Sequence, residues 1–139
     1  AAEGPRARTA VLCGSLEMEL SQMDPAEEQE FREGLGAGES GLDRMVRLTH
    51  DAGDLVTFFT GNPNEVRAWT VPRGTTALKA AGKVHSDFER GFIRAEVVGF
   101  DDLDGCGSMA EARRRGGLRQ EGKDYLVGDG DVLNILFNV

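Results

Sequence analysis

The sequence predicts an α+β protein in which a helical segment, residues 1–54, precedes a small mixed sheet in residues 55–139. Two observations support this fold class. Apolar residues follow helical spacing before Leu55, whereas short β-rich runs separated by Gly- and Pro-containing turns come after it. The charge balance also changes, with 12 acids and 5 bases in the first segment against 12 acids and 11 bases in the second.

The composition is typical of a globular domain and argues against several other classes of protein. Of 139 residues, 40% are apolar, and no apolar run approaches the roughly 20 residues that span a bilayer. Residues 1–8 lack the apolar core of a secretory signal, and the Ala start is interpreted as that of a fragment, a trimmed product or a processed one. Cys13 and Cys106 lie far apart, which favours a reduced compartment, and the Cys and His residues have no zinc-ligand spacing.

A short apolar run at Thr9–Cys13 contains β-branched residues and predicts a buried strand of the kind found in parallel sheets. One or two helical turns are expected next, over Ser15–Gln22. A single strand cannot bury itself, so its sheet neighbours are expected on another segment or another chain.

Two further helices are predicted from the residues at their ends. Asp24 can cap a helix that starts at Pro25 and ends near Leu35, where glycines follow. Ser40 can cap a third helix over residues 41–52. Its apolar face would comprise Leu42, Met45, Val46, Leu48 and Thr49.

The second segment begins with a predicted hairpin. Leu55–Thr60 and Glu65–Val71 are rich in β-branched and aromatic residues, and they flank a Gly-Asn-Pro-Asn turn. A Pro-Arg-Gly turn then leads to a helix over Ala77–Val84, which either Thr75 or Thr76 can cap.

The remaining elements complete the predicted sheet. Ile93–Phe100 is expected to be a third strand, and Ser108–Arg115 a short basic helix. Asp124–Val127 and Asp131–Phe137 are expected to be the last two strands, joined by a tight Gly-Asp-Gly turn. This order of elements fits the β-grasp (ubiquitin-like) plan, in which a mixed sheet wraps over one helix.

The chain resembles a known family over two long strings, EVRAWTVPRGTTALKAAGKVHSDFERGFIRAEVVGFDDL and EGKDYLVGDGDVLNILFNV. Both are similar to the C-terminal TGS domain of the YchF/Obg-like ATPase family, and the match covers essentially all of Leu55–Val139. The shared TGS features are the Gly74-Thr75-Thr76 helix entry, His85 at the helix end and the Gly128–Asp131 turn. The resemblance therefore implies a TGS domain of β-grasp fold.

The first segment resembles the end of that family's P-loop α/β G domain, through VLCGSLEMELSQMDPAEEQEF and ESGLDRMVR. In the family, a strand ends there in a Ser-Ala-Lys-like loop that lies against the nucleotide base. Cys13, Gly14 and Ser15 stand at the matching positions, which implies a degenerate cofactor-binding loop because Ser15 replaces Lys. The implied cofactor of the full-length family is ATP, or GTP, with Mg, and we expect none in this chain.

The sequence contains no Gly-x-x-x-x-Gly-Lys-Ser/Thr motif, so it has no backbone cradle and no Lys for the β- and γ-phosphates. The family's base-reading motif would lie upstream of Ala1. Because phosphoryl transfer depends on positioning and electrostatic stabilisation, we expect no catalytic residues here and no hydrolysis by this chain alone. The family as a whole is implied to hydrolyse ATP or GTP.

Several features admit a functional and a structural interpretation, and the structural one is favoured in each. Asp102–Gly105 matches a nucleotide-switch motif but is expected to be an acidic loop, and Gly128–Asp131 is expected to be a turn rather than a cation site. His85 is expected to lie at a helix end rather than to act as a general base. Cys13 and Cys106 are expected to be inert, because a reactive thiol needs a basic setting.

Arg113, Arg114 and Arg115 are the main functional candidates. Three consecutive Arg on a short helix cannot all face a core, and their permanent charge suits phosphate contacts in RNA, although a solvated helix end is the alternative. Trp69 could stack on a base, but core packing is favoured. Further cations could extend the RNA-binding or ribosome-binding surface, namely Arg119, Lys123, Lys79, Lys83, Arg90 and Arg94.

Three hypotheses for the function stay open. The TGS domain could be an RNA-, ribosome- or protein-binding regulatory module, or the chain could be a C-terminal piece of an ATPase that regulates its site. It could also be a degenerate paralogue without a P-loop that serves as a structural subunit. The expected partners are a ribosome or another RNA-bearing complex and the family's N-terminal G-domain region, with neither membrane nor DNA. The expected location is the cytoplasm, or an organelle stroma or matrix.

Overall fold

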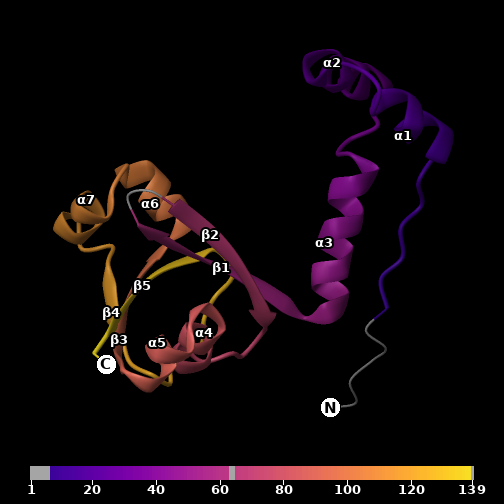
Figure 1. The fold of residues 1–139 in the computed structure, drawn as a ribbon. Helices are drawn as coiled ribbons and strands as arrows, with labels where there is room; N and C mark the ends of the chain where they lie inside the picture. The colour runs from indigo at the N-terminus through magenta and orange to yellow at the C-terminus, as the bar shows by residue number, and fades with distance from the viewer. Residues whose placement is uncertain (1–6, 63–64, 139) are drawn as a thin grey trace. The chain divides into compact units, whose positions relative to one another are not determined.

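A computed structural model describes residues 7–62 and 65–138, and the chain divides into two compact units, residues 1–53 and 54–139 (Figure 1). The first unit contains helices α1 (Gly14–Leu20), α2 (Pro25–Leu35) and α3 (Gly41–Gly53). These helices confirm the predicted ones at nearly the expected boundaries.

Side chains at the helix ends explain where these helices begin and stop. The Asp24 carboxylate accepts a hydrogen bond from the Ala26 N–H at 3.0 Å, which satisfies one free donor at the start of α2. Gly36 ends α2 in the left-handed region, with φ 63°. The Ser40 hydroxyl accepts from the Asp43 N–H at 3.0 Å and caps α3, as predicted.

The predicted strand at Thr9–Cys13 is wrong. This segment is an irregular, mostly exposed stretch, and 86% of Val11 is accessible to solvent. A strand forms only where a neighbour pairs with its backbone, and the described residues of the first unit contain no strand. Local composition therefore predicted a strand that nothing in this unit pairs with.

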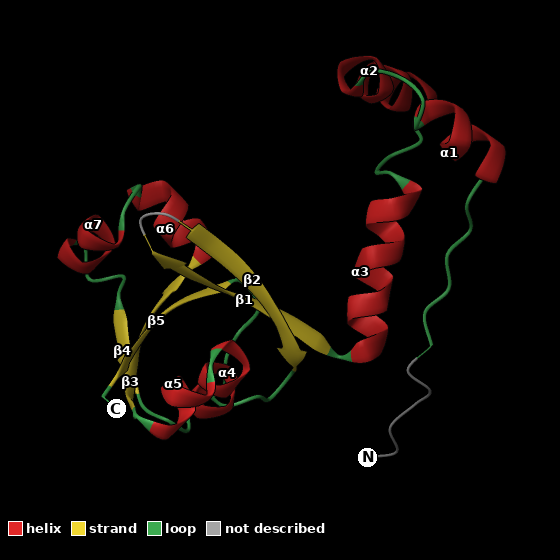
Figure 2. Cartoon of the chain, viewed as in Figure 1, coloured by secondary structure: helices red, strands yellow, loops and turns green. Residues whose placement is uncertain are grey.

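The second unit is built on a mixed sheet with the strand order β2-β1-β5-β3-β4 among the described residues (Figure 2). Strand β1 runs parallel to β5, and the other neighbouring pairs are antiparallel. The strands are β1 (Leu55–Asn62), β2 (Glu65–Pro72), β3 (Phe92–Gly99), β4 (Arg119–Glu121) and β5 (Asp131–Phe137). The pairing of β1 with β2 confirms the predicted hairpin, although Pro63 and Asn64 of its turn lie outside the described residues.

The predicted strand at Asp124–Val127 is also wrong, since only an isolated bridge joins Leu126 to Thr76. The backbone of this segment instead serves the start of helix α4 (Ala77–Val84). The Tyr125 carbonyl accepts from the Ala77 N–H at 2.7 Å, and the Lys123 carbonyl accepts from the Leu78 N–H at 3.2 Å. These bonds satisfy N–H groups that a helix leaves free at its first turn. The strand at the β3 edge of the sheet is instead β4, which lies earlier in the sequence.

Helices cover both faces of the sheet. Phe58 shares a buried core with Ala80 and Ala81 of α4, and helix α5 (Ser86–Arg90) packs on the same side through Phe88. The next strand residue, Phe59, contacts Phe100 of helix α6 (Phe100–Cys106), with ring centroids 5.8 Å apart. Because successive strand residues point to opposite faces, α4 and α6 lie on opposite faces.

Helix α6 replaces the acidic loop predicted at Asp102–Gly105, and Gly107 ends it in the left-handed region with φ 75°. It leads directly to helix α7 (Met109–Arg114). The predicted turn at Gly128–Asp131 is present, and the Asp129 carboxylate accepts from the Thr57 N–H at 2.7 Å. No helix among the described residues is long and apolar enough to cross a membrane.

Candidate nucleic-acid interface

The arginine cluster lies at the C-terminal end of α7. The short helix predicted over Ser108–Arg115 is present, and the Ser108 hydroxyl caps its start by accepting from the Glu111 N–H at 3.2 Å. The side chains of Arg113, Arg114 and Arg115 are 62%, 79% and 58% exposed, respectively. A short helix with its small residue Ala112 buried leaves all three guanidinium groups at the surface.

Arg113 is held by a buried carboxylate on the sheet. Its Nη2 donates to Oε1 of Glu96 at 2.5 Å, although Glu96 is only 6% exposed. The Asn134 side-chain amide on β5 donates to the other oxygen, Oε2, at 2.9 Å. The hydrogen bond from Asn134, followed by that from Arg113, lowers the pKa of Glu96, so the carboxylate stays ionised. Ala95 and Val97, the neighbours of Glu96 on β3, belong to the core under α4. Because side chains alternate along a strand, Glu96 points to the other face of the sheet, where α7 lies.

Arg114 and Arg115 share a different carboxylate, on their own helix. Nη2 of Arg114 lies 2.8 Å from Oε2 of Glu111, and Nε of Arg115 lies 2.7 Å from Oε1. One negative charge therefore faces two positive charges, and this pair of arginines keeps an excess charge of one. The spacing of Glu111 from Arg115, four residues along a helix, is a signal that could have predicted this pair.

Arg119 belongs to a separate network that holds the Gly128–Asp131 turn. Its Nη2 donates to the Tyr125 hydroxyl at 3.1 Å and lies 3.6 Å from the buried Asp131 carboxylate. Asp131 also accepts from the Tyr125 hydroxyl and from the Gly128 N–H, at 2.8 and 2.7 Å. Burial, followed by the bond to Asp131, raises the pKa of Tyr125 to about 12, so the phenol stays a donor.

Three of the other predicted cations lie away from α7, whereas the exposed Arg94 lies on the same face of β3 as Glu96 and helps to lower the pKa of that carboxylate. Lys79 and Lys83 lie on α4 and Arg90 lies on α5, so all three belong to the sheet face opposite α7. The Lys79 ammonium lies 2.7 Å from Glu89, and Arg90 pairs with Asp87 and lowers the pKa of that carboxyl. Lys123 is exposed near the start of α4.

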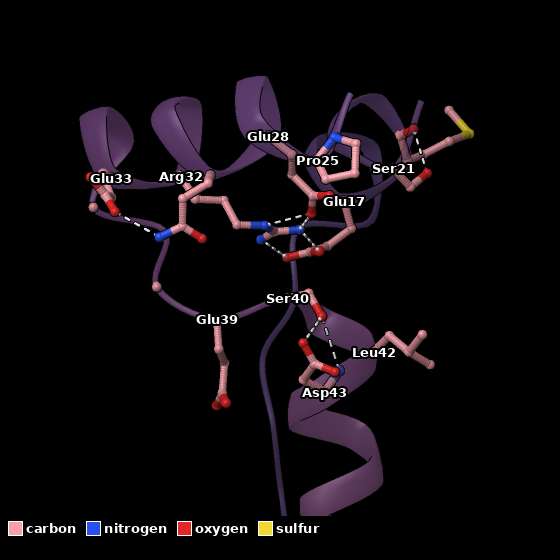
Figure 3. A pocket seen from close by; sticks show the side chains of 14 residues that line it. Glu17, Ser21, Pro25, Glu28, Arg32, Glu33, Glu39, Ser40, Leu42 and Asp43 are labelled. Atoms are coloured by element: carbon pink, nitrogen blue, oxygen red, sulfur yellow. Dashed lines mark hydrogen bonds and ion pairs between the residues drawn. The ribbon is translucent and has the colours of Figure 1, made fainter. Parts of the chain in front are cut away.

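Cys13, Gly14 and Ser15 lie exposed at the start of α1. The Ser15 hydroxyl is 3.5 Å from the Cys13 sulfur, and this hydrogen bond lowers the pKa of the thiol. A hollow of about 1140 Å³ lies elsewhere among the three helices, and these residues do not line it (Figure 3). Its lining includes the carboxylates Glu17, Glu28, Glu33, Glu39 and Asp43. Such a lining is unsuitable for a triphosphate, because like charges repel.

Trp69 and His85 have structural roles. Trp69 packs against the core and donates from Nε1 to the Thr60 hydroxyl at 2.9 Å, which confirms the core interpretation. Nδ1 of His85 accepts from the Asp87 N–H at 3.1 Å and caps α5, as a histidine at a helix boundary can. Across residues 7–62 and 65–138, no group of three or more His, Cys, Asp or Glu side chains could hold a metal ion.

Comparisons with known proteins identify similar chains. The profile of the YchF-GTPase_C family, described as "Protein of unknown function (DUF933)", matches residues 55–138. The Bacillus subtilis protein named "Ribosome-binding ATPase YchF" is 47% identical over 138 residues, 99% of this chain and 38% of that protein. "Obg-like ATPase 1" of Gallus gallus is 42% identical over 96% of this chain and 34% of its own length.

A solved structure agrees with these sequence matches. The YchF GTPase of Schizosaccharomyces pombe superposes with a TM-score of 0.75 at 30% identity, covering 85% of this chain and 31% of that one. This chain therefore spans about a third of the length of the relatives it matches.

Proposed function

Because the family profile matches residues 55–138, the chain belongs to the YchF-GTPase_C family, and we propose that its second unit docks a YchF-type ATPase onto the ribosome or another RNA-bearing partner. The relative named as a ribosome-binding ATPase, 47% identical over 99% of this chain, carries this proposal. The exposed guanidinium groups of α7 support it, since arginine contacts phosphate oxygens readily. Such a role belongs in the cytoplasm, or in an organelle that has ribosomes.

The second unit is, on this proposal, a TGS domain with a β-grasp fold. Two features of its topology support the assignment. The parallel pair β1 and β5 lies inside a mixed sheet, and α4 packs across one face through Ala80 and Ala81. The surface that would bind a partner is then the outer side of α7, where the exposed arginines lie.

The chain alone neither binds nor hydrolyses a nucleoside triphosphate, on the same proposal. The first unit is the end of a G domain, and the ATP or GTP with Mg of the full-length relatives would be held by other parts of those proteins. The exposed loop at Cys13–Ser15 and the acidic lining of the hollow support this assignment, because the loop contains no cation and Arg32 in the lining is already paired with Glu17 and Glu28.

Co-sedimentation of the chain with purified ribosomal subunits across a salt series tests the proposal. Binding should weaken steeply between about 50 and 200 mM salt, because phosphate contacts release counterions. A calorimetric titration of the same sample with Mg-ATP should show no binding. Failure to pellet at any salt concentration would instead favour a structural subunit whose partner is protein.

A further inference from the structure

Two carboxylates hold the arginines of α7, and they differ in where they come from. Glu96 is buried and comes from β3, so it is fixed independently of α7. Glu111 comes from α7 itself, and its side chain is partly exposed. The two groups therefore differ in how easily a ligand could displace them.

Glu96 leaves most of the Arg113 guanidinium available. Its two oxygens are both satisfied, one by Arg113 and one by Asn134. A guanidinium has five N–H donors, and Arg113 gives Glu96 a bond from Nη2 while most of its side chain faces solvent. Arg113 can therefore keep its bond to Glu96 and donate to a phosphate at the same time, in an orientation already set by the sheet.

Glu111 occupies donors that a phosphate would use. The Nη2 group of Arg114 and the Nε group of Arg115 both point at this single carboxylate. A phosphate oxygen that approaches either arginine must replace Glu111 or share the guanidinium with it. Exposed ion pairs of this kind contribute little free energy, so a phosphate can replace Glu111 at either arginine. The cost of breaking the ion pair lowers the net affinity for RNA.

We propose that these two carboxylates have opposite effects on RNA binding: Glu96 positions Arg113 for a phosphate contact, whereas Glu111 competes with phosphate for Arg114 and Arg115. This inference rests on the proposed function, since it assumes that α7 binds an RNA backbone. Net charge alone predicts the same effect for neutralising Glu96 and for neutralising Glu111, because either change adds one positive charge to the same surface. This inference instead predicts opposite effects.

The test compares Glu96→Gln with Glu111→Gln in the full chain. Affinity for a fluorescent single-stranded RNA is measured by anisotropy across a salt series, and circular dichroism melts check the fold. Glu111→Gln should bind RNA about threefold more tightly, the size of an exposed ion pair. Glu96→Gln should bind more weakly, and its salt slope should fall by about 0.7, the loss of one contact to single-stranded RNA.

Each outcome either supports or overturns the inference. Equal tightening in both variants would show that only net charge matters and would overturn it. No change in either variant, with binding lost when Arg113, Arg114 and Arg115 become Glu, would overturn it but leave the proposed function standing. RNA binding that is absent in the wild type would overturn this inference, and if the chain also fails to pellet with ribosomal subunits, the proposed function would be overturned with it.

A second variant covers the case in which Glu96→Gln does not fold. Arg113→Gln changes an exposed side chain and should show the same fall in slope of about 0.7. An unchanged slope in Arg113→Gln would mean that Arg113 makes no phosphate contact, which overturns the positioning role of Glu96.

Discussion

The Glu17 carboxylate on α1 accepts two hydrogen bonds from the Arg32 guanidinium on α2, at 2.8 and 3.3 Å (Figure 3). It also accepts from the Gly41 N–H at 2.9 Å, the first backbone donor of α3. Arg32 is buried and receives a second carboxylate from Glu28, four residues earlier on its own helix. One carboxylate thus joins all three helices of the first unit.

Acid should loosen this unit through Glu17. Bonds from Arg32 and then from the Gly41 N–H lower its pKa from 4.5 to about 2. A depressed pKa in the folded state gives stability that is present above pH 4.5 and is lost as the pH falls towards 2. The intrinsic exchange rate of amides slows on acidification from pH 5 to 3, so exchange in α1–α3 should slow by less than the intrinsic rate does, and this excess exchange reports the lost stability. Glu17→Gln should remove that excess, and an unchanged pH dependence in the variant would rule out Glu17 as the cause.

Gly91 should tolerate no side chain. Its carbonyl accepts from the Asn138 N–H at 2.9 Å, and a Cβ at Gly91 would overlap the Asn138 backbone. Gly91→Ala should lower the free energy of unfolding by at least about 2 kcal/mol in a urea titration. Gly105→Ala is the matched control, because a Cβ there meets nothing within 4 Å and sits in α6. Equal effects of the two substitutions would contradict the close approach at Gly91.

Substitutions of Arg119 and Arg114 should have different effects, the first on the stability of the fold and the second on RNA binding. Arg119→Gln removes the cation beside buried Asp131 and should lower the free energy of unfolding by up to about 1 kcal/mol, with little change in RNA affinity. Arg114→Gln should weaken RNA binding with little change in stability, because among the described residues its guanidinium pairs with partly exposed Glu111 on the same helix. Denaturation and RNA anisotropy on both variants check this assignment, and a binding loss in Arg119→Gln would put that residue in the interface.

The cations on α4 and α5 should contribute little to RNA binding. Lys79, Lys83 and Arg90 lie on the sheet face opposite α7, so a strand bound along α7 should not reach them. Changing all three to Glu should weaken RNA binding much less than the same change at Arg113, Arg114 and Arg115. Matching losses in the two triple variants would mean that RNA wraps both faces.

Helices and turns could be predicted from the sequence because their signals are local. Asp24 and Ser40 each cap the helix that they were expected to cap, and Thr76 is the one of the two threonine candidates that caps α4. Strands depended on partners that local composition does not reveal. Thr9–Cys13 has no strand to pair with among residues 7–53, and the backbone of Asp124–Val127 is used by α4. Strand β4, Arg-Gln-Glu, has no apolar residue to signal it.

The candidate site was predictable only in part for the same reason. Three consecutive arginines signalled a charged surface, and their exposure follows from the small size of α7. Their partners could not all be foreseen. Glu96 lies 17 residues from Arg113 and meets it only after β3 and α7 pack together, and Asn134 joins them from β5. Sequence spacing likewise could not show that Arg119 bonds to Tyr125 rather than forming part of the α7 arginine cluster.

The most direct test of the account compares two triple variants for co-sedimentation with ribosomal subunits. One changes Arg113, Arg114 and Arg115 to Glu. The control changes Arg47, Arg67 and Arg73 to Glu, which are similarly exposed and also paired with carboxylates. Both variants carry the same net charge. The account predicts that the α7 variant no longer pellets while the control does. Equal loss in both would contradict an α7-centred interface and indicate a response to net charge alone.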